Sequence, residues 1–205
     1  HETHYEYAKY MLNNKKHVLC EKPAVIKKAQ AEELYSLAKE NNVVFMEAVK
    51  TAYCPGFHAM MAAAKSGKIG RIIDVEAAFS RLTPVNTREY MAQDYNGSFL
   101  EFGSYVCMPV FELLGCDYDD VRFHSMRAVN GVDAYTKAVF SFGGKSAEVK
   151  TGLGVKTEGQ LLISGTNGYI LAKSPWWLTK EFEIRYEDPN KKEVYKYAYE
   201  GSGLQ

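Results

Sequence analysis

The chain has 205 residues, and its 25 basic and 25 acidic side chains give a formal net charge of zero. A balanced charge offers no electrostatic surface for nucleic acid or an anionic membrane, and no apolar run approaches the roughly 18 residues that a membrane span needs. Hydrophobic residues make up 46% and charged residues 24% of the sequence, which excludes a largely disordered chain.

The first helix is predicted close to the start of the sequence. Thr3 and Glu6 have capping-box spacing, and residues 4–14 carry a helical pattern. His1-Glu2-Thr3-His4 places its histidines three residues apart, whereas a zinc-protease helix needs four, so capping explains this stretch better than a metal. A chain that enters its architecture so early, without Met, signal peptide or transit sequence, is expected to be a fragment.

Alternating strands and helices follow. Residues 17–20 and 43–46 are short apolar stretches that predict strands, and residues 27–41 between them predict a helix. Strands and helices that alternate at this length favour a parallel sheet covered by helices.

The pattern changes from about residue 48 onward. We expect a helix at 57–66, a strand at 71–82, a loop to about 96 and a helix at 98–114. Further strands are predicted at 121–129, 134–142, 146–154, 159–164, 168–172, 181–187 and 193–199. Tight-turn signals such as Asn130-Gly131 separate them, so this sheet should be large, mostly antiparallel and open-faced. The expected fold class is therefore α/β plus α+β, with the end of a doubly wound parallel sheet first.

The cysteines indicate the redox compartment. They form no CxxC pair and lie in apolar or helical stretches, which predicts reduced, buried thiols in a cytoplasmic protein. They are Cys20, Cys54, Cys107 and Cys116.

Phosphate-binding motifs are missing from the sequence. No GxGxxG occurs, and Ser66-Gly67-Lys68 lacks the upstream glycine and strand of a phosphate loop. Gly165 to Gly168 lies between predicted strands and is expected to be a hairpin turn.

Glu21-Lys22-Pro23 stands where the strand at 17–20 ends. Ligands of open α/β sheets bind at the carboxyl ends of strands. Pro23 fixes its own φ and restricts Lys22, so the lysine is held at this end. From these residues alone, two interpretations stay open: a surface-loop lysine, or a side chain placed for chemistry.

A series of motifs extends this pattern along the chain. A histidine in the first helix, HVLCEKP, AEEL and MEA occur in order, followed by YCPGFHAMMAAAKSGKIGRI and TREYMAQDYNGSFLEFGSYVCMPVFELLG. This order resembles the Gfo/Idh/MocA family of NAD(P)-dependent oxidoreductases, nearest its dihydrodiol and pentose dehydrogenase branch. The resemblance covers residues 1 to about 172. It implies hydride transfer between NAD or NADP and a hydroxyl-bearing carbon of a sugar, polyol or related alcohol.

The resemblance also implies roles for individual residues. Lys22 matches the family lysine that contacts the nicotinamide ribose and the reacting oxygen of the substrate. The residues that it assigns are Lys22, Glu101 and Tyr105 for catalysis, Glu21, Lys22, Pro23 and His4 for the cofactor, and Arg88 and Tyr53 for the substrate, with no metal. For Arg88, a solvated loop arginine remains the alternative.

Three departures from the family pattern affect the expected substrate. Glu101 stands where the family usually has Asp, and Lys50 stands where this branch often has Trp. Tyr95-Asn96-Gly97 retains one of the usual three glycines. These differences leave the substrate open without changing the expected reaction type.

The expected chemistry needs a group that handles the hydroxyl proton. A tyrosine has a reference pKa near 10, and a lysine ammonium within about 4–6 Å would lower it. Glu101 and Tyr105 are four residues apart and share one helix face. We therefore predict that Lys22 and Tyr105 form an acid/base pair, with Glu101 orienting the substrate or the lysine. The alternative is that Tyr105 serves only in packing.

The resemblance implies two domains. Residues 1–47 would be the incomplete tail of a dinucleotide-binding domain, and residues 48–205 a substrate-binding and oligomerisation domain with a truncated C-terminus. The absent first half would carry the pyrophosphate-binding turn, so residues 1–205 alone are expected to be inactive. The alternative function is a non-catalytic nucleotide-sensing or oligomerisation module of the same fold, which an intact EKP lysine disfavours.

Aromatic residues near the end of the chain have two interpretations. Trp176-Trp177 and the stripe of Tyr195, Tyr197 and Tyr199 could face a second subunit or the protein core. Following the family, we expect a homodimer or homotetramer formed through the open sheet face. The expected partner is a small-molecule substrate, with neither nucleic acid nor membrane.

Overall fold

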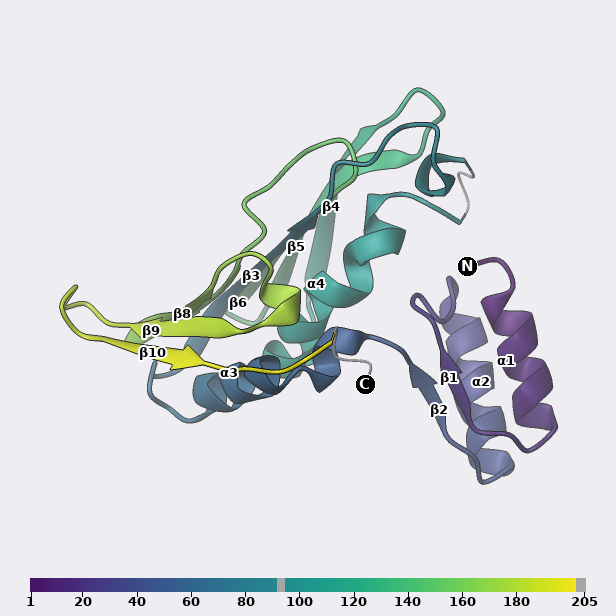
Figure 1. Cartoon of the computed structure of the whole chain (residues 1–205), viewed down its shortest axis with the longest axis horizontal. Coiled ribbons are helices and arrows are strands. Elements are labelled where there is room, and N and C mark those ends of the chain that lie inside the picture. Colours follow the sequence, from purple (N-terminus) through teal and green to yellow (C-terminus); the bar gives the residue numbers. More distant parts are fainter. Residues whose placement is uncertain (92–94, 202–205) are drawn as a thin grey trace.

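The computed structural model describes residues 1–91 and 95–201, which form two sheets (Figure 1). The smaller sheet has two parallel strands, and both of its helices pack on one side. Its elements are α1 (His4–Asn13), β1 (Val18–Cys20), α2 (Lys28–Glu40) and β2 (Phe45–Glu47). Leu12 and Leu34, one from each helix, are fully buried and form a small core with Cys20 and Phe45. This is the helix-covered parallel sheet that the alternating pattern predicts.

The larger sheet has eight strands in the order β10-β9-β8-β7-β3-β6-β5-β4. They are β3 (Ile72–Ser80), β4 (Asp120–Arg127), β5 (Asp133–Phe142), β6 (Lys145–Gly152), β7 (Leu161–Gly165), β8 (Gly168–Ala172), β9 (Glu181–Arg185) and β10 (Lys192–Lys196). Every neighbouring pair is antiparallel except β3 with β6. The predicted fold class is therefore confirmed, and Gly165 pairs with Gly168 across the expected hairpin.

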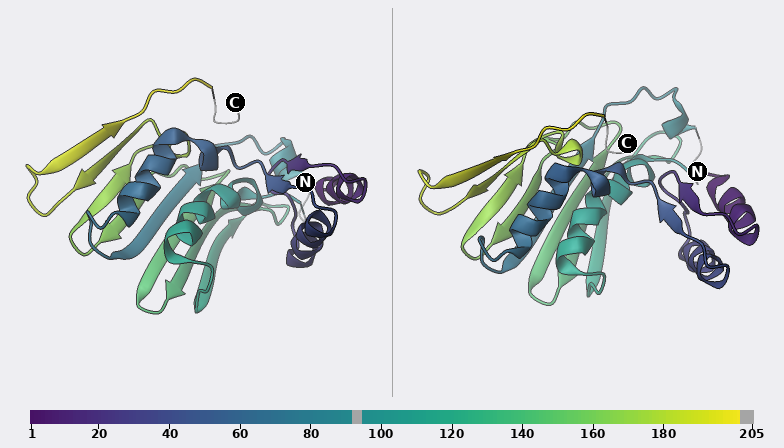
Figure 2. Two further views of the ribbon diagram at one scale, coloured as in Figure 1. Left: turned by 90° about the horizontal axis from the view of Figure 1, so that it is seen from below. Right: turned by 60° about the horizontal axis from the view of Figure 1, so that its bottom comes forward.

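Two helices, α3 (Pro55–Lys65) and α4 (Ser98–Leu114), cover the same face of the large sheet (Figure 2). Strand residues alternate accordingly: Ala138 and Phe140 of β5 are buried against the helices, while Lys137 and Val139 point to the other face. No described helix covers that second face, so the sheet is open on one side as expected.

The helix-covered face also takes up the aromatic residues near the end of the chain. The ring of Tyr195 stacks on Phe182 with 4.8 Å between centroids, and both belong to the main core. Trp176 is fully buried in a 3₁₀ turn, not a strand, and its Nε1–H donates to the Ala78 carbonyl at 2.8 Å. Of the two interpretations, the structure supports core packing.

Three local expectations need correction or lie outside the described residues. Thr3 forms no side-chain cap, because it has helical backbone angles instead of the extended angles that an N-cap needs, so the capping-box prediction is wrong. Cys116, beyond the end of α4, is exposed, although all four thiols are free as predicted. The prediction of a truncated C-terminus falls on residues 202–205, and these residues lie outside the described part of the chain.

The start of α4 is capped by a distant strand. Gly97 precedes the helix and has no side chain to cap it, and Asp133 of β5 takes that place. Asp133 Oδ2 accepts hydrogen bonds from the Ser98 hydroxyl at 2.6 Å and the Phe99 amide at 3.0 Å. A carboxylate at a helix N-terminus satisfies free amide groups and complements the helix dipole. Asp133 therefore fixes α4 relative to the sheet.

We predict that Gly97→Ala destabilises the protein more than Gly67→Ala. Gly97 has φ of +119°, and an added Cβ would lie 1.9 Å from Asp133 Oδ1. Gly67 also has a positive φ, +84°, but its Cβ would meet nothing within 4 Å. The expected losses in free energy of unfolding are about 2–4 kcal/mol for Gly97→Ala and about 1 kcal/mol for Gly67→Ala, measured by urea denaturation. Equal losses would show that the contact with Asp133 is unimportant.

Candidate active site

Lys22 reaches across from the small sheet to helix α4. Its loop follows β1 directly, so the lysine lies at the carboxyl ends of the parallel strands. Lys22 Nζ donates to the backbone carbonyl of Glu101 at 2.8 Å and to Glu101 Oε1 at 3.0 Å. The two side chains are only 13% and 11% exposed. The lysine is thus a partly buried group held in one position and is not a solvated loop residue.

Glu101 lies close to several basic side chains. While Oε1 binds Lys22, Oε2 lies 3.6 Å from an Arg88 nitrogen and 3.9 Å from His1 Nε2. Oε2 is buried and accepts no hydrogen bond from any described residue. The carboxylate therefore keeps one acceptor oxygen for a further partner.

Tyr105 lies one helical turn beyond Glu101, with its ring centroid 5.6 Å from Lys22 Nζ. Burial raises the pKa of Tyr105 to about 12, and the negative charges of Glu21, Glu101 and Glu47 add to the effect. The expectation that Lys22 lowers this pKa is wrong. The ammonium lies over the ring face and is bonded to Glu101, so it does not offset the burial and the three carboxylates.

The peptide group after Lys22-Pro23 is held from two sides. His4 Nδ1 donates to the Pro23 carbonyl at 2.8 Å, and the Ala24 amide donates to Glu47 Oε1 at 2.9 Å. His4 thus contacts the backbone of the lysine loop. Glu47 was not singled out from the sequence, although it ends β2 at the same sheet edge as Lys22, which is a usable signal.

A stack of aromatic rings adjoins Tyr105. Phe79 lies between Trp177, with centroids 3.6 Å apart, and Phe102, at 4.3 Å, and is tilted against Tyr105 at 5.2 Å. The sequence alone assigns Trp177 no role in the site. Phe79 and Trp177 remain partly exposed, so they form an apolar wall beside the Lys22 group.

The predicted substrate residues differ in their positions. Arg88 approaches Glu101, but its side chain is 64% exposed. Tyr53 is 46% exposed in a 3₁₀ turn and, within the described part of the chain, makes no hydrogen bond or ring contact with Lys22, Glu101 or Tyr105. Arg88 therefore lies close to Glu101, whereas Tyr53 makes no described contact with these three residues.

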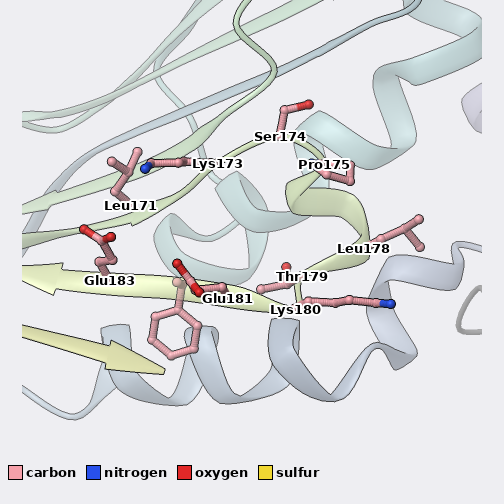
Figure 3. A pocket seen from close by; sticks show the side chains of 10 residues that line it. Leu171, Lys173, Ser174, Pro175, Leu178, Thr179, Lys180, Glu181 and Glu183 are labelled. Carbon is pink, nitrogen blue, oxygen red and sulfur yellow. The ribbon is translucent and has the colours of Figure 1, made fainter. Parts of the chain in front are cut away.

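A separate pocket of about 370 Å³ lies between the loop at residues 173–180 and strands β8 and β9 (Figure 3). Leu171 and Leu178 give it apolar walls, and Lys173 and Glu183 lie at its margin. It contains none of the residues around Lys22. In residues 1–91 and 95–201, no cluster of three or more His, Cys, Asp or Glu side chains is arranged to hold a metal ion. No helix in these ranges is both long and apolar enough to cross a membrane.

Comparison with known proteins finds relatives that match most of this chain. The curated relatives include scyllo-inositol 2-dehydrogenase (NADP(+)) IolU of Bacillus subtilis, 31% identical over 90% of this chain and 58% of the relative. They also include trans-1,2-dihydrobenzene-1,2-diol dehydrogenase of Bos taurus, 27% identical over 84% of this chain and 52% of the relative. The chain thus spans little more than half the length of these curated relatives.

Solved structures share the fold. An NAD binding oxidoreductase from Klebsiella pneumoniae has a TM-score of 0.80 and 18% identity, over 94% of this chain and 57% of that chain. KijD10, a 3-ketoreductase from Actinomadura kijaniata in complex with TDP-benzene and NADP, has a TM-score of 0.78 and 22% identity, over 98% of this chain and 63% of that chain.

Two family descriptions match successive parts of the chain. Residues 1–49 match the oxidoreductase family with an NAD-binding Rossmann fold, and residues 57–171 match the GFO/IDH/MocA C-terminal domain. The second match alone covers more than half of the chain, and the resemblance found in the sequence is confirmed. The chain belongs to the GFO/IDH/MocA oxidoreductase family.

Proposed function

We propose that the protein transfers a hydride between NAD(P) and a hydroxyl-bearing carbon of a sugar, polyol or related alcohol. The observation that carries this proposal is the position of Lys22, at the carboxyl edge of the parallel strands, bonded to Glu101 and lying over Tyr105. The named activities of the relatives, on scyllo-inositol and on a dihydrodiol, support this class of substrate.

The residues of this chain fit one end of the cofactor. Glu21, Lys22 and Pro23 would hold the nicotinamide ribose, and His4 would support them through the Pro23 carbonyl. The cofactor, when bound, supplies the hydride acceptor or donor. The sequence contains no GxGxxG turn for the pyrophosphate, so we expect residues 1–205 alone to lack turnover.

The two domains of this proposal follow the two sheets. Residues 1–47 would belong to the cofactor domain and residues 48–205 to the substrate domain. Leu19 and Met46 pair side by side on the face of the small sheet opposite the helices, where they are 65% and 38% exposed. Parallel strands are normally covered on both faces, so this apolar face supports membership of a larger parallel sheet.

In this proposal Lys22 and Tyr105 have different roles toward the reacting oxygen of the substrate. Lys22 donates a hydrogen bond from Nζ to the substrate oxygen and stabilises negative charge developing there. Tyr105 Oη carries a proton at neutral pH, as an ordinary tyrosine does, and the pKa raised to about 12 makes the phenolate still scarcer. It can give that proton to a carbonyl oxygen, whereas alcohol oxidation requires the scarcer phenolate. The resting protonation state therefore favours carbonyl reduction at neutral pH, and higher pH favours oxidation.

Glu101 and the aromatic wall would orient the substrate. Glu101 Oε2 accepts no hydrogen bond from a described residue and can accept one from a hydroxyl next to the reacting carbon. Phe79 and Trp177 offer a flat apolar surface for a carbon ring. A ring bearing neighbouring hydroxyl groups would satisfy both features.

We expect Tyr105 to remain a neutral phenol well above pH 10. Tyrosine labelled with ¹³C at Cζ can be titrated by NMR in this chain, with Tyr105→Phe identifying the signal. Because burial and three carboxylates oppose ionisation, the midpoint should lie near 12. A midpoint at or below 10 would instead support the phenolate stabilised by Lys22.

We expect Lys22→Met in the intact enzyme to lower kcat by at least about 100-fold while the dissociation constant for the cofactor changes little. Lys28→Met is the matched control, because Lys28 is an exposed helix lysine whose ion-pair partner is Glu32, one helical turn away. Steady-state absorbance at 340 nm and fluorescence titration would provide the two measurements. Unchanged turnover in Lys22→Met would contradict a catalytic role for Lys22, whereas cofactor binding without turnover in the unaltered intact protein would favour a nucleotide-sensing module.

We also propose that the open face of the large sheet binds a second copy of the chain. Lys137 and Lys150 pair with Glu148 on this face at 2.6 and 3.5 Å, which reduces its net charge, and Leu162 adds apolar surface. Light scattering should show a dimer or tetramer. Leu162→Asp should dissociate it, whereas Val129→Asp, in a distant exposed turn, should not. A strictly monomeric parent protein would contradict this proposal.

A further inference from the structure

The peptide group between Pro23 and Ala24 is fixed at both of its polar atoms. Its carbonyl accepts a hydrogen bond from His4 at 2.8 Å, and its N–H donates to Glu47 Oε1 at 2.9 Å. Only Pro23 separates this peptide group from Lys22, so its hydrogen bonds restrain the loop that carries the lysine. The position of Lys22 therefore depends on two side chains that do not contact it.

The same oxygen of Glu47 also reaches helix α4. The Ser104 hydroxyl donates to Glu47 Oε1 at 3.3 Å, and Ser104 immediately precedes Tyr105. Glu47 itself is fixed as the last residue of β2, where the next amide, Ala48, donates to the Cys20 carbonyl at 2.7 Å. One carboxylate thus connects the parallel sheet, the lysine loop and the helix that carries Glu101 and Tyr105.

We propose that Glu47 is a positioning residue that holds Lys22 in register with Tyr105 and Glu101. This inference rests on the proposed function, because it assigns Glu47 a role in the same proton chemistry. Glu47 acts through the Ala24 amide and the Ser104 hydroxyl. Displacements of about 1 Å between catalytic groups lower rates about 100-fold, so such a link has a measurable effect.

The charge of Glu47 provides a second signature. Around Tyr105 lie Lys22 and Glu21 from the lysine loop, Glu101 from α4 and Glu47 from β2. The negative charge of Glu47 helps to raise the pKa of Tyr105. A neutral residue at position 47 should therefore lower the Tyr105 midpoint, which a purely structural role would not require.

The experiment compares Glu47→Ala and Glu47→Gln in the intact enzyme. Glu47→Ala removes the acceptor, and we expect kcat to fall by about 10- to 100-fold with little change in the cofactor dissociation constant. Glu47→Gln keeps an amide oxygen that can accept from Ala24, so it should retain more activity and still lower the Tyr105 midpoint. Glu33→Gln is the control, because Glu33 is also a bonded carboxylate but binds Tyr5 and Lys9 of α1, away from the lysine loop.

Amide hydrogen exchange gives a readout that needs no turnover. Exchange at Ala24 should accelerate in Glu47→Ala and stay unchanged in Glu33→Gln. Unchanged Ala24 exchange, or faster exchange with undiminished kcat, would overturn the positioning role.

If Glu47→Ala does not fold, Glu47→Gln provides the test through its kcat and the midpoint of its Tyr105 titration. Unaltered values of both would overturn the positioning role. Absence of turnover in the unaltered intact protein would instead refute the proposed function, and exchange at Ala24 with the Tyr105 midpoint would still test the link itself.

Discussion

The ion pair between Lys22 and Glu101 is the interaction on which the candidate site depends. It joins residues 79 positions apart, and both side chains are almost entirely removed from solvent. Burying two charges costs free energy that only close geometry and further hydrogen bonds recover. The second bond from Lys22 Nζ to the Glu101 carbonyl supplies one such compensation. The lysine loop and helix α4 must therefore be held accurately by other contacts.

Those contacts come from elements far apart in the sequence. Asp133 of β5 fixes the first turn of α4 and thereby the positions of Glu101 and Tyr105 on this helix. His4 and Glu47 fix the peptide group between Pro23 and Ala24. The position of the Lys22–Glu101 pair thus follows from the capped helix α4 and from the lysine loop, which is hydrogen-bonded on two sides. The hydrogen bonds that hold α4 and the loop do not involve the atoms of the ion pair.

The sequence predicts the elements well and their mutual contacts poorly. Helix α4 has the predicted bounds, 98–114, because a glycine on each side limits one continuous apolar pattern. The alternation along β5 likewise reflects a local property of one strand. Asp133 went without a role because its partner Ser98 lies 35 residues away, and Trp177 because its stacking partner Phe79 belongs to a distant strand. The end of β2 could have indicated Glu47, but not its bond to Ser104, 57 residues away. Such distances leave no periodic signal.

The same limit explains the wrong pKa direction for Tyr105. Spacing along the helix correctly places it beside Glu101, but its ionisation depends on burial and on carboxylates from other elements. Glu21, Glu47 and Glu101 outnumber Lys22 close to this ring, and Arg88 stands at the exposed rim. This excess of carboxylates offers acceptor oxygens to hydroxyl groups. The proposed substrates, neutral polyols and related alcohols, carry such hydroxyl groups, so the electrostatics support the same proposal as the geometry.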